Sequence, residues 1–327
     1  MVVNRLPNSP IVSHRSATDA PFVCRVEESA ERRYWALPLS NVEGIMLVGR
    51  NNRIGKMCYN EAVVTRSVAD LHAKTSRRSE RVTQVVLGTP LMVAKERRTW
   101  LRVTTPDAYR GWIEVAATRR LKFREPRYAF KGRIAVVKSN VAVIYLEPSR
   151  EARESITVTV DTRLELVSEQ THRCRVRLPG LSYGWIRRED VSIRPAGFNY
   201  AVTNRQRTAE SGKRFLGVPY LWGGTTPLGF DCSGFVQLVY KMNGVSIPRD
   251  ADMQFMIGTP IDTLDVAAAD LVFFSNGSSG ITHVGIYLAN GEFLHSSGRA
   301  SGVTINRLNE PFFRSIFVGA RRLWHSA

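Results

Sequence analysis

The chain repeats part of itself at a fixed distance of 73 residues, the distance from Arg102 to Arg175. Both copies contain short segments in which apolar and polar residues alternate, and both close on Gly-Trp-Ile. Alternation with a period of two is typical of a β-strand that buries one face. The matching residues are Thr89, Leu91, Glu96, Arg102, Val103, Pro106, Gly111, Trp112 and Ile113 in the first copy and Thr162, Leu164, Glu169, Arg175, Val176, Pro179, Gly184, Trp185 and Ile186 in the second. The repeat therefore predicts two copies of one small β-barrel.

A cysteine follows the repeat in a setting that favours a helix start. Asp231 is a good N-cap residue, and Cys232 comes directly after it. Apolar residues then recur at helical spacing, as Phe235, Leu238, Val239 and Met242. Gly244 stands where a left-handed residue would end the helix. We therefore predict a helix that begins at Cys232, with the thiol at its positive end, where the unpaired N–H groups favour the thiolate and the Asp231 carboxylate opposes it.

Two histidines lie in consecutive strand-like segments further along the chain, His283 and His295. A two-residue Asn290-Gly291 hairpin loop would pair Ile286 with His295 and put the histidines on opposite sheet faces. A three-residue loop, Ala289 to Gly291 with Gly291 left-handed, would instead pair His295 with Gly285 and put both rings on one face. We predict the three-residue loop, because Gly285 then leaves room for the imidazoles to meet.

These residues together indicate a thiol hydrolase. Cys232 is the predicted nucleophile, His283 its base, His295 the group that orients the base, and the N–H of Cys232 a donor to the oxyanion. A lone cysteine is more often a small buried apolar residue, and Cys24, Cys58 and Cys174 are interpreted so because they lack metal-ligand spacing. Three aromatic residues near the motifs are likewise expected in the core, and these are Trp222, Phe273 and Phe274.

From about Tyr220 to Arg322 the chain resembles the NlpC-type, papain-like cysteine peptidases of bacterial cell-wall turnover. The motifs that carry the resemblance are Pro219-Tyr220-Leu221-Trp222-Gly223-Gly224, Phe230-Asp231-Cys232-Ser233-Gly234-Phe235, Pro248-Arg249-Asp250-Ala251, Ala269-Asp270-Leu271-Val272-Phe273-Phe274 and His283-Val284-Gly285-Ile286-Tyr287. The resemblance implies an α+β papain-like domain in which Cys232, His283 and His295 are catalytic. It also implies that the substrate groove is lined by Tyr220, Asp231, Ser233 and Asp250. The implied reaction is hydrolysis of the γ-D-glutamyl to diaminopimelate or lysine bond of murein peptides, with no metal or organic cofactor.

The two repeats resemble the bacterial SH3-like domains that accompany such peptidases. In relatives with two barrels, the first barrel often narrows the groove and selects peptides with a free N-terminal L-alanine. Carried to this chain, that idea needs a carboxylate and a phenol near the peptide amine, and Glu80 and Tyr109 are the candidates. Either residue could equally be a solvated surface group. The alternative role for the barrels is docking on wall polymer, which would leave the groove open to intact murein.

The predicted domains are an N-terminal extension over 1–55, a first SH3-like barrel over 56–120, a second over 121–196 and the peptidase domain over 197–327. Pro and Gly mark the last boundary near Arg194 to Gly197.

Smaller segments complete this division of the chain. A flexible tail is expected over the first twenty or so residues, which are polar and interrupted by prolines. Strands that pack on the first barrel are assigned to Tyr34 to Val48, and a helix is predicted from Asn204 to Leu216.

Forty-six Lys and Arg against 29 Asp and Glu give a net charge of +17, which attracts acidic ligands such as murein peptides. Nucleic acid is the rival partner, but the basic residues are scattered and no zinc or aromatic-rich binding signature accompanies them. No apolar run is long enough to span a membrane, and Met1 to Ala20 lacks a secretory core, so the expected location is cytoplasmic, or extracellular or periplasmic if a leader has been removed. Two other functions stay open: a non-catalytic wall-binding protein, and an amidase or acyltransferase on another substrate.

Overall fold

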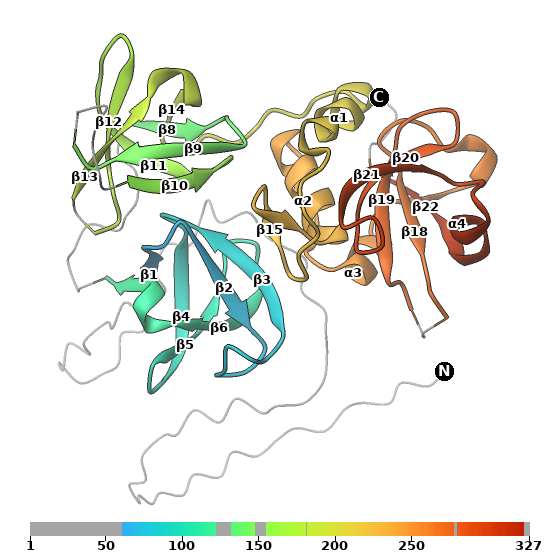
Figure 1. Ribbon diagram of the computed structural model, residues 1–327, viewed down its shortest axis with the longest axis horizontal. Coiled ribbons are helices and arrows are strands. Elements are labelled where there is room, and N and C mark those ends of the chain that lie inside the picture. Colours follow the sequence, from blue (N-terminus) through green and yellow to red (C-terminus); the bar gives the residue numbers. More distant parts are fainter. Residues whose placement is uncertain (1–60, 122–131, 148–154, 181, 278–279, 324–327) are drawn as a thin grey trace, which may run out of the picture. The chain divides into compact units, whose positions relative to one another are not determined.

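The computed structural model describes residues 61–121, 132–147, 155–180, 182–277 and 280–323. The predicted tail, the strands assigned to Tyr34 to Val48, and the cysteines Cys24 and Cys58 lie outside these residues. The described chain contains two seven-stranded sheets, a two-stranded sheet and a six-stranded sheet, which follow one another along the sequence (Figure 1).

The first seven-stranded sheet, here called the first β unit, has the strand order β3-β2-β6-β5-β4-β1-β7. Its strands are β1 (Glu61–Val64), β2 (Val68–His72), β3 (Arg81–Val86), β4 (Pro90–Arg97), β5 (Trp100–Thr104), β6 (Arg110–Glu114) and β7 (Thr118–Arg120), with a 3-10 turn over Val115–Ala117. Alternate residues of β5 and β6, such as Leu101, Val103 and Ile113, fill its core, as the period-two pattern predicts.

The second seven-stranded sheet, the second β unit, has the order β10-β9-β13-β12-β11-β8-β14, which repeats the first order strand for strand. Its strands are β8 (Arg133–Val137), β9 (Val141–Tyr145), β10 (Ser155–Thr159), β11 (Arg163–Glu169), β12 (Arg173–Arg177), β13 (Tyr183–Arg187) and β14 (Val191–Pro195), with a 3-10 turn over Arg188–Asp190. The pair His72 and Trp112 of the first unit recurs as Tyr145 and Trp185 of the second. The sequence repeat is thus a structural repeat, and Cys174 lies in its core as predicted.

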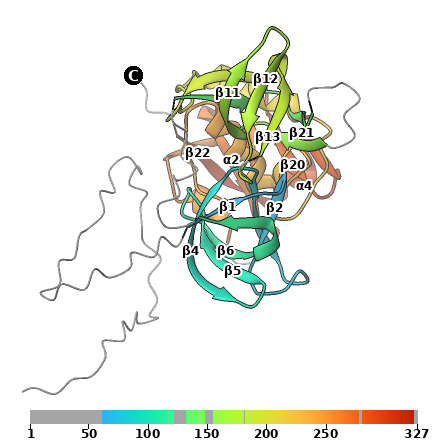
Figure 2. The same cartoon turned by 90° about the vertical axis from the view of Figure 1, so that its left-hand side faces the viewer.

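The third region contains the six-stranded sheet β17-β22-β18-β19-β20-β21 and most of the helices (Figure 2). The strands are β15 (Thr225–Thr226), β16 (Gly229–Phe230), β17 (Thr259–Ile261), β18 (Leu271–Phe274), β19 (His283–Tyr287), β20 (Glu292–Ser297), β21 (Gly302–Arg307) and β22 (Phe317–Arg322). The helices are α1 (Arg205–Gly212), α2 (Cys232–Met242), α3 (Ala251–Phe255) and α4 (Pro311–Ile316), with 3-10 turns over Lys213–Phe215 and Thr263–Asp265.

The two faces of this sheet have separate cores. Leu271 and Phe273 of β18 pack with α2, whereas Phe274 faces the other way and packs with Phe313 of α4. Phe273 and Phe274 are fully buried, as expected. The same expectation was wrong for Trp222, whose side chain is 61% exposed. Its place in a Trp-Gly-Gly turn explains the difference, because a turn carries its side chain out of the sheet.

Helix α2 confirms the predicted start and end. The Asp231 side chain accepts a hydrogen bond from the N–H of Gly234, and the helix runs from Cys232 to Met242. Gly244 follows with a φ of +82°, the left-handed conformation that glycine adopts without strain. The predicted helix from Asn204 is also present as α1, with Asn204 as its N-cap, and it continues as the 3-10 turn to Phe215.

The hairpin of β19 and β20 has the predicted three-residue loop. Tyr287 pairs with Phe293, and the N–H of Glu292 donates to the carbonyl of Ala289 at 2.8 Å, so the loop is Ala289 to Gly291. A Cβ on Gly285 would lie 3.2 Å from the Cβ of His295, which confirms that these two residues face each other.

Candidate active site

The Cys232 thiol lies at the first residue of α2 and is 8% exposed. Burial raises the pKa of this thiol to about 12, and the Asp231 carboxylate acts in the same direction. The backbone N–H groups of Val284 and Ser233 lower the pKa of the thiol and so oppose that rise. Val284 directly follows His283 in β19, so the strand that carries the predicted base passes next to the thiol. In the described part of the chain, no hydrogen bond joins the sulfur to the imidazole itself.

The two histidines are joined to each other and to two further side chains. Nε2 of His283 lies 2.6 Å from Nδ1 of His295, and Nε2 of His295 lies 2.9 Å from Oδ1 of Asn306. The Asn306 amide donates in turn to both carboxylate oxygens of Glu310, at 3.1 and 2.9 Å. Glu310 precedes α4 and also accepts from the N–H of Arg307 at 2.7 Å. The result is one continuous chain of hydrogen bonds from Glu310 to His283.

This chain has a direction that fixes the tautomers. A carboxylate only accepts, so the Asn306 amide nitrogen must face Glu310 and its oxygen must face His295. Nε2 of His295 therefore carries a hydrogen, and Nδ1 of the neutral ring accepts from Nε2–H of His283. Neutral His283 consequently keeps its lone pair on Nδ1. That nitrogen is the one available as a base, and no residue of the described chain bonds to it.

Both rings are neutral at ordinary pH. Burial lowers the pKa of His283 to about 3, and His295 lowers it further by charge repulsion. Burial likewise lowers the pKa of His295 to about 4, against the opposing effects of Asn306 and Glu310. With the thiol pKa raised, the resting pair is a thiol beside a neutral imidazole. The proton can therefore pass from the thiol to the imidazole only when bound substrate changes the surroundings of the sulfur.

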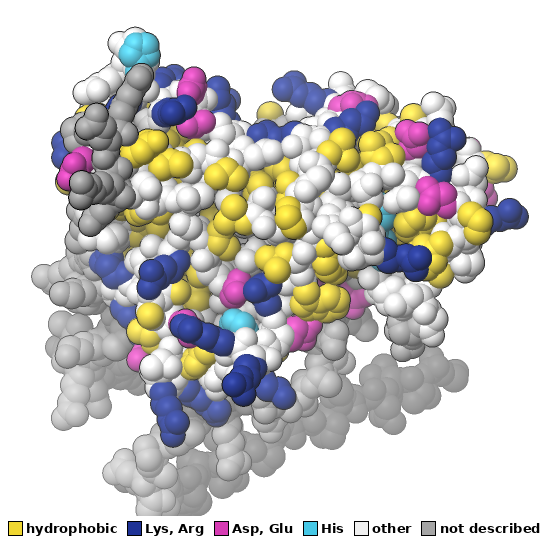
Figure 3. All heavy atoms as spheres, viewed as in Figure 1, with side chains coloured by type: hydrophobic (Ala, Val, Ile, Leu, Met, Phe, Trp, Pro, Cys, Tyr) yellow, Lys and Arg dark blue, Asp and Glu magenta, His cyan; other side chains and the backbone are white. Residues whose placement is uncertain are grey.

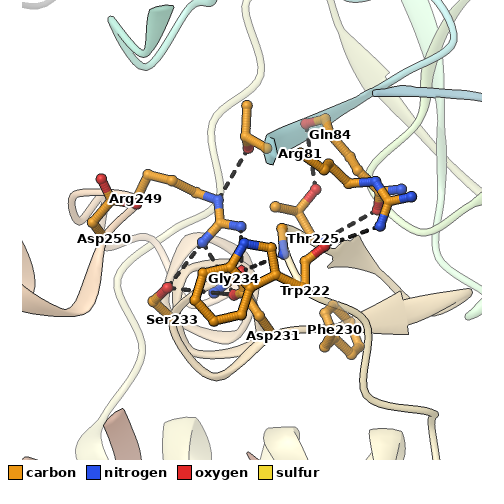
Figure 4. A network of polar contacts seen from close by, with 12 residues as sticks. Arg81, Gln84, Trp222, Thr225, Phe230, Asp231, Ser233, Gly234, Arg249 and Asp250 are labelled. Atoms are coloured by element: carbon orange, nitrogen blue, oxygen red, sulfur yellow. Dashed lines mark hydrogen bonds and ion pairs between the residues drawn. The ribbon is translucent and has the colours of Figure 1, made fainter. Parts of the chain in front are cut away.

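A buried ion pair holds the segment around the cysteine (Figure 4). Arg249 is 3% exposed and donates to both carboxylate oxygens of Asp231, at 3.1 and 2.6 Å, and to the Ser233 hydroxyl at 2.9 Å. Asp231 also accepts from the N–H groups of Gly223 and Gly234. The structure therefore places Asp231 and Ser233, two predicted groove residues, inside a satisfied polar network.

The other predicted groove residues lie where the first β unit meets the third region. The Tyr109 hydroxyl donates to the two carboxylate oxygens of Asp250, at 3.1 and 2.9 Å. Burial raises the pKa of Tyr109, and the carboxylates of Asp250 and Glu80 raise it further. Glu80 is exposed and accepts from the indole N–H of Trp222 at 3.1 Å. Tyr109 thus bonds directly to Asp250, whereas Glu80 acts on Tyr109 through its charge alone.

Tyr220 lies on the cysteine side of this region. Its ring is partly buried, and burial followed by the charge of Cys232 raises the pKa of the phenol to about 12. An electrostatic effect of this kind requires the phenol and the thiol to be near neighbours.

Sequence reasoning assigned no role to three residues of this site, Arg249, Asn306 and Glu310. Arg249 was part of the Pro-Arg-Asp motif, and a lone arginine beside an acid gives no sign that it will be buried. Asn306 and Glu310 are four residues apart beyond the last recognisable motif, and only the pairing of β21 with β20 brings them to His295. A polar residue on a strand that neighbours a catalytic histidine was the available signal.

Two further findings bear on cofactors and membranes. Within the described residues, no group of three or more His, Cys, Asp and Glu side chains could hold a metal ion. None of the described helices combines the length and the apolar character that crossing a membrane requires.

Comparison with known proteins identifies two segments of the chain. Residues 217–322 match the NlpC/P60 family, and residues 71–117 match a domain described as the bacterial dipeptidyl-peptidase Sh3 domain. A gamma-D-glutamyl-L-lysine dipeptidyl-peptidase of Bacillus cereus is 34% identical over 251 residues, which cover 73% of this chain and 74% of the relative. A Bacillus subtilis enzyme of the same name is 30% identical over 254 residues, which cover 73% of this chain and 80% of that relative.

A solved structure agrees with these matches. The crystal structure of an NlpC/P60 family protein from Bacillus cereus superposes with a TM-score of 0.73 at 27% identity, over 80% of this chain and 99% of that one. A murein DD-endopeptidase of Escherichia coli is 42% identical over 123 residues, which are 37% of this chain and 64% of the relative.

Proposed function

The chain belongs to the NlpC/P60 family of cysteine peptidases, and we propose that it hydrolyses the γ-D-glutamyl to diamino-acid bond of murein peptides with Cys232 as its nucleophile. The observation that carries the proposed roles of these residues is the hydrogen-bonded chain that leaves the lone pair of His283 on Nδ1, on the strand whose Val284 N–H lowers the pKa of the thiol. An activated cysteine needs such an oriented base.

The proposed reaction proceeds through a thioester. Nδ1 of His283 takes the proton of the Cys232 thiol, and the sulfur attacks the carbonyl carbon of the γ-glutamyl amide. The N–H of Cys232 donates to the oxyanion, and His283 then protonates the departing amine, which breaks the C–N bond. A water molecule, deprotonated by His283, attacks the thioester carbonyl, which breaks the C–S bond and releases the γ-carboxyl product, and His283 returns the proton to the sulfur. Because both resting groups are neutral, the thiolate exists only after this transfer.

Asn306 and Glu310 serve this reaction as positioning residues. They touch neither sulfur nor substrate, and they hold the hydrogen of His295 on Nε2, so that the lone pair of His283 faces away from His295. Asn306→Leu should lower kcat by about tenfold to a hundredfold at unchanged KM, because partners of this kind have effects of that size.

The pH profile separates this role from a merely structural one. Glu310→Gln removes a negative charge that raises the pKa of His295, so the protonated forms of the two rings become less favourable. The acid limb of kcat/KM should therefore move to lower pH in Glu310→Gln. An unchanged pH profile in that variant, together with a normal kcat for Asn306→Leu, would remove both residues from the mechanism.

The first β unit supplies the proposed recognition of the peptide amine. Glu80 and Asp250 provide carboxylates and Tyr109 a phenol beside them, which suits an ammonium group. The names of the two Bacillus relatives describe dipeptidyl-peptidases, and cleavage two residues from an end requires that the end be recognised. We further propose that the second β unit is a second SH3-like domain, which its identical strand order supports.

One experiment tests the activity and the amine site together. L-Ala-γ-D-Glu-diaminopimelate and its lysine counterpart are offered with a free and with an acetylated amine to the wild type and to Cys232→Ala. We expect cleavage of the free forms by the wild type alone. Residual cleavage by Cys232→Ala would exclude the cysteine mechanism, and equal cleavage of the acetylated peptides would exclude the amine site.

The cytoplasmic location stays a prediction, and fractionation of cells followed by immunoblotting tests it.

A further inference from the structure

The second β unit contains a hollow of about 670 Å³ that the peptidase reaction does not use. Its lining includes Tyr145 and Trp185, which pair directly across β9 and β13. Residues opposite each other in a sheet put their side chains on the same face, so the two rings lie side by side, and both are partly exposed. A volume of this size is within the range of about 300 to 1,000 Å³ that is typical of small-ligand sites.

Basic side chains surround these rings. The remaining lining residues are Lys138, Thr171, His172, Arg173, Ile186, Arg187, Arg188 and Glu189, so that Glu189 is the one acid among the residues that line the hollow. The side chain of Arg187 is 62% exposed and that of Glu189 is 73% exposed, so their ion pair at 3.3 Å contributes little. Arg188 forms an ion pair with Glu169 at 2.6 Å, and its guanidinium group lies at the rim of the hollow. An anion is therefore favoured at this place.

The first β unit has a hollow at the equivalent position, of about 440 Å³, but two of its three lining arginines pair with acids of the same lining. His72 and Trp112 replace Tyr145 and Trp185, and Glu114 stands where the second unit has Arg187. Glu114 binds Arg77 through two hydrogen bonds, at 2.6 and 2.8 Å.

A second ion pair in the first hollow joins Arg81 to Asp70, at 2.9 Å. Figure 3 shows Lys and Arg side chains scattered over the face in view, so basic charge alone does not mark a site. What distinguishes the second hollow is that four Lys and Arg residues line it with one acid, Glu189, whereas three Arg residues line the first hollow with two acids.

We propose that the second β unit binds an acidic saccharide in this hollow. A sugar ring would stack on Trp185 and Tyr145, and its carboxylate or phosphate would pair with Arg187 and Lys138. The proposal does not depend on the peptidase mechanism, because binding here and cleavage at Cys232 are separate measurements.

The test uses the full chain labelled with 5-fluorotryptophan, in which Trp185→Phe identifies the resonance of Trp185. N-acetylmuramic acid should shift that resonance, and N-acetylglucosamine, which lacks the lactyl carboxylate, should not. N-acetylglucosamine 6-phosphate tests whether the preferred acidic group is a phosphate. If this sugar shifts the Trp185 resonance at a lower concentration than N-acetylmuramic acid does, the ligand is a phosphorylated saccharide.

Two charge reversals form a matched pair of variants. Arg187→Glu should weaken binding of N-acetylmuramic acid about fivefold, a change typical of one exposed charge. Arg66→Glu makes the same change at the rim of the first hollow and should leave the binding unchanged. Both variants should cleave the tripeptide at the wild-type rate, which shows that they are folded.

Three results would overturn the proposal. The first is an equal shift of the Trp185 resonance by N-acetylglucosamine. The second is an equal loss of affinity in Arg66→Glu. The third is tighter binding of a six-residue oligothymidylate than of either acidic sugar, which would indicate a nucleic-acid site instead.

Discussion

The two β units have the same strand order and differ in what they contact. The first unit bonds to the segments around the cysteine, through Tyr109 to Asp250 and through Thr83, whose hydroxyl accepts from the buried Arg249 at 3.0 Å. The second unit contacts the opposite end of α2, where Asp161 pairs with Lys241 at 2.6 Å. One duplicated unit thus contributes to the candidate site, and the other supports the helix that carries the nucleophile.

The equivalent positions show how the copies diverged. At the repeat distance, Tyr109 corresponds to Ser182 and Thr83 to Ile156, so the second unit lacks the side chains that reach the site. Gln84, which bonds to Thr225 of the peptidase region, corresponds to Thr157. A fold can therefore be kept in both copies while its bonding groups are changed independently.

The largest effect is expected at Arg249, which joins the first unit to Asp231. Arg249→Leu leaves the Asp231 carboxylate buried without its cation, and loss of one partner of such a pair costs about 3 to 5 kcal/mol of unfolding free energy. Urea unfolding followed by tryptophan fluorescence measures it. Thr83→Val is the control, since it removes one hydrogen bond and should cost about 1 kcal/mol. Equal losses of unfolding free energy in the two variants would show that the ion pair stabilises the fold no more than one hydrogen bond does.

A smaller effect on activity is expected at Tyr109, and it compares the two units directly. Tyr109→Phe removes the hydroxyl that donates to Asp250, and kcat/KM for the free-amine tripeptide should fall about tenfold, as for loss of one hydrogen bond to a charged group. Ser182→Ala makes a similar loss of one hydroxyl at the equivalent place of the second unit and should leave kcat/KM unchanged. A reduction in both variants would show that the effect is general destabilisation.

The smallest effect is expected at Lys241 and depends on pH. Burial alone would raise the pKa of Asp161, but Lys241 and Arg163 outweigh it and hold that pKa below its ordinary value. A carboxyl group whose pKa is lowered by folding stabilises the folded protein above pH ~4. This stabilisation is lost as the pH falls through the pKa of the folded state. Lys241→Met should therefore cost at most about 1 kcal/mol at pH 7, since Lys241 is half-exposed, and nothing at the acid end.

The control for this prediction is Lys213→Met, which removes an exposed pair with Glu210. Thermal unfolding between pH 7 and pH 3 gives the comparison. A difference from wild type that persists unchanged to pH 3 would show that Asp161 is not the responsible group.

Local chemistry in the sequence was enough for much of this fold. Asp231 as N-cap, Gly244 as helix end and the Ala289 to Gly291 loop each follow from the conformational preference of one or two residues. The strand repeat could be predicted because alternation is visible without knowing any contact. Trp222 was misjudged because it lies in a Trp-Gly-Gly turn, which holds its side chain outside the core.

The hydrogen-bonded chain could not be predicted for a different reason. His295 and Asn306 meet only because β20 and β21 pair in one register, and a shift by one residue would turn Asn306 to the other face. The burial of Arg249 likewise results from packing between separate parts of the chain. Contacts of this kind are properties of the assembled sheet and not of any segment.

Glu310 connects the short helix α4 to both histidines of the candidate site. The carboxylate stands at the beginning of that helix and sets the direction of every hydrogen bond up to His283. Any disturbance that displaces α4 would let both imidazoles exchange tautomers and leave the sulfur without a proton acceptor. Inactivation on mild heating should then precede the loss of bulk structure, and substitutions that anchor α4 offer a route to an enzyme that keeps working for longer.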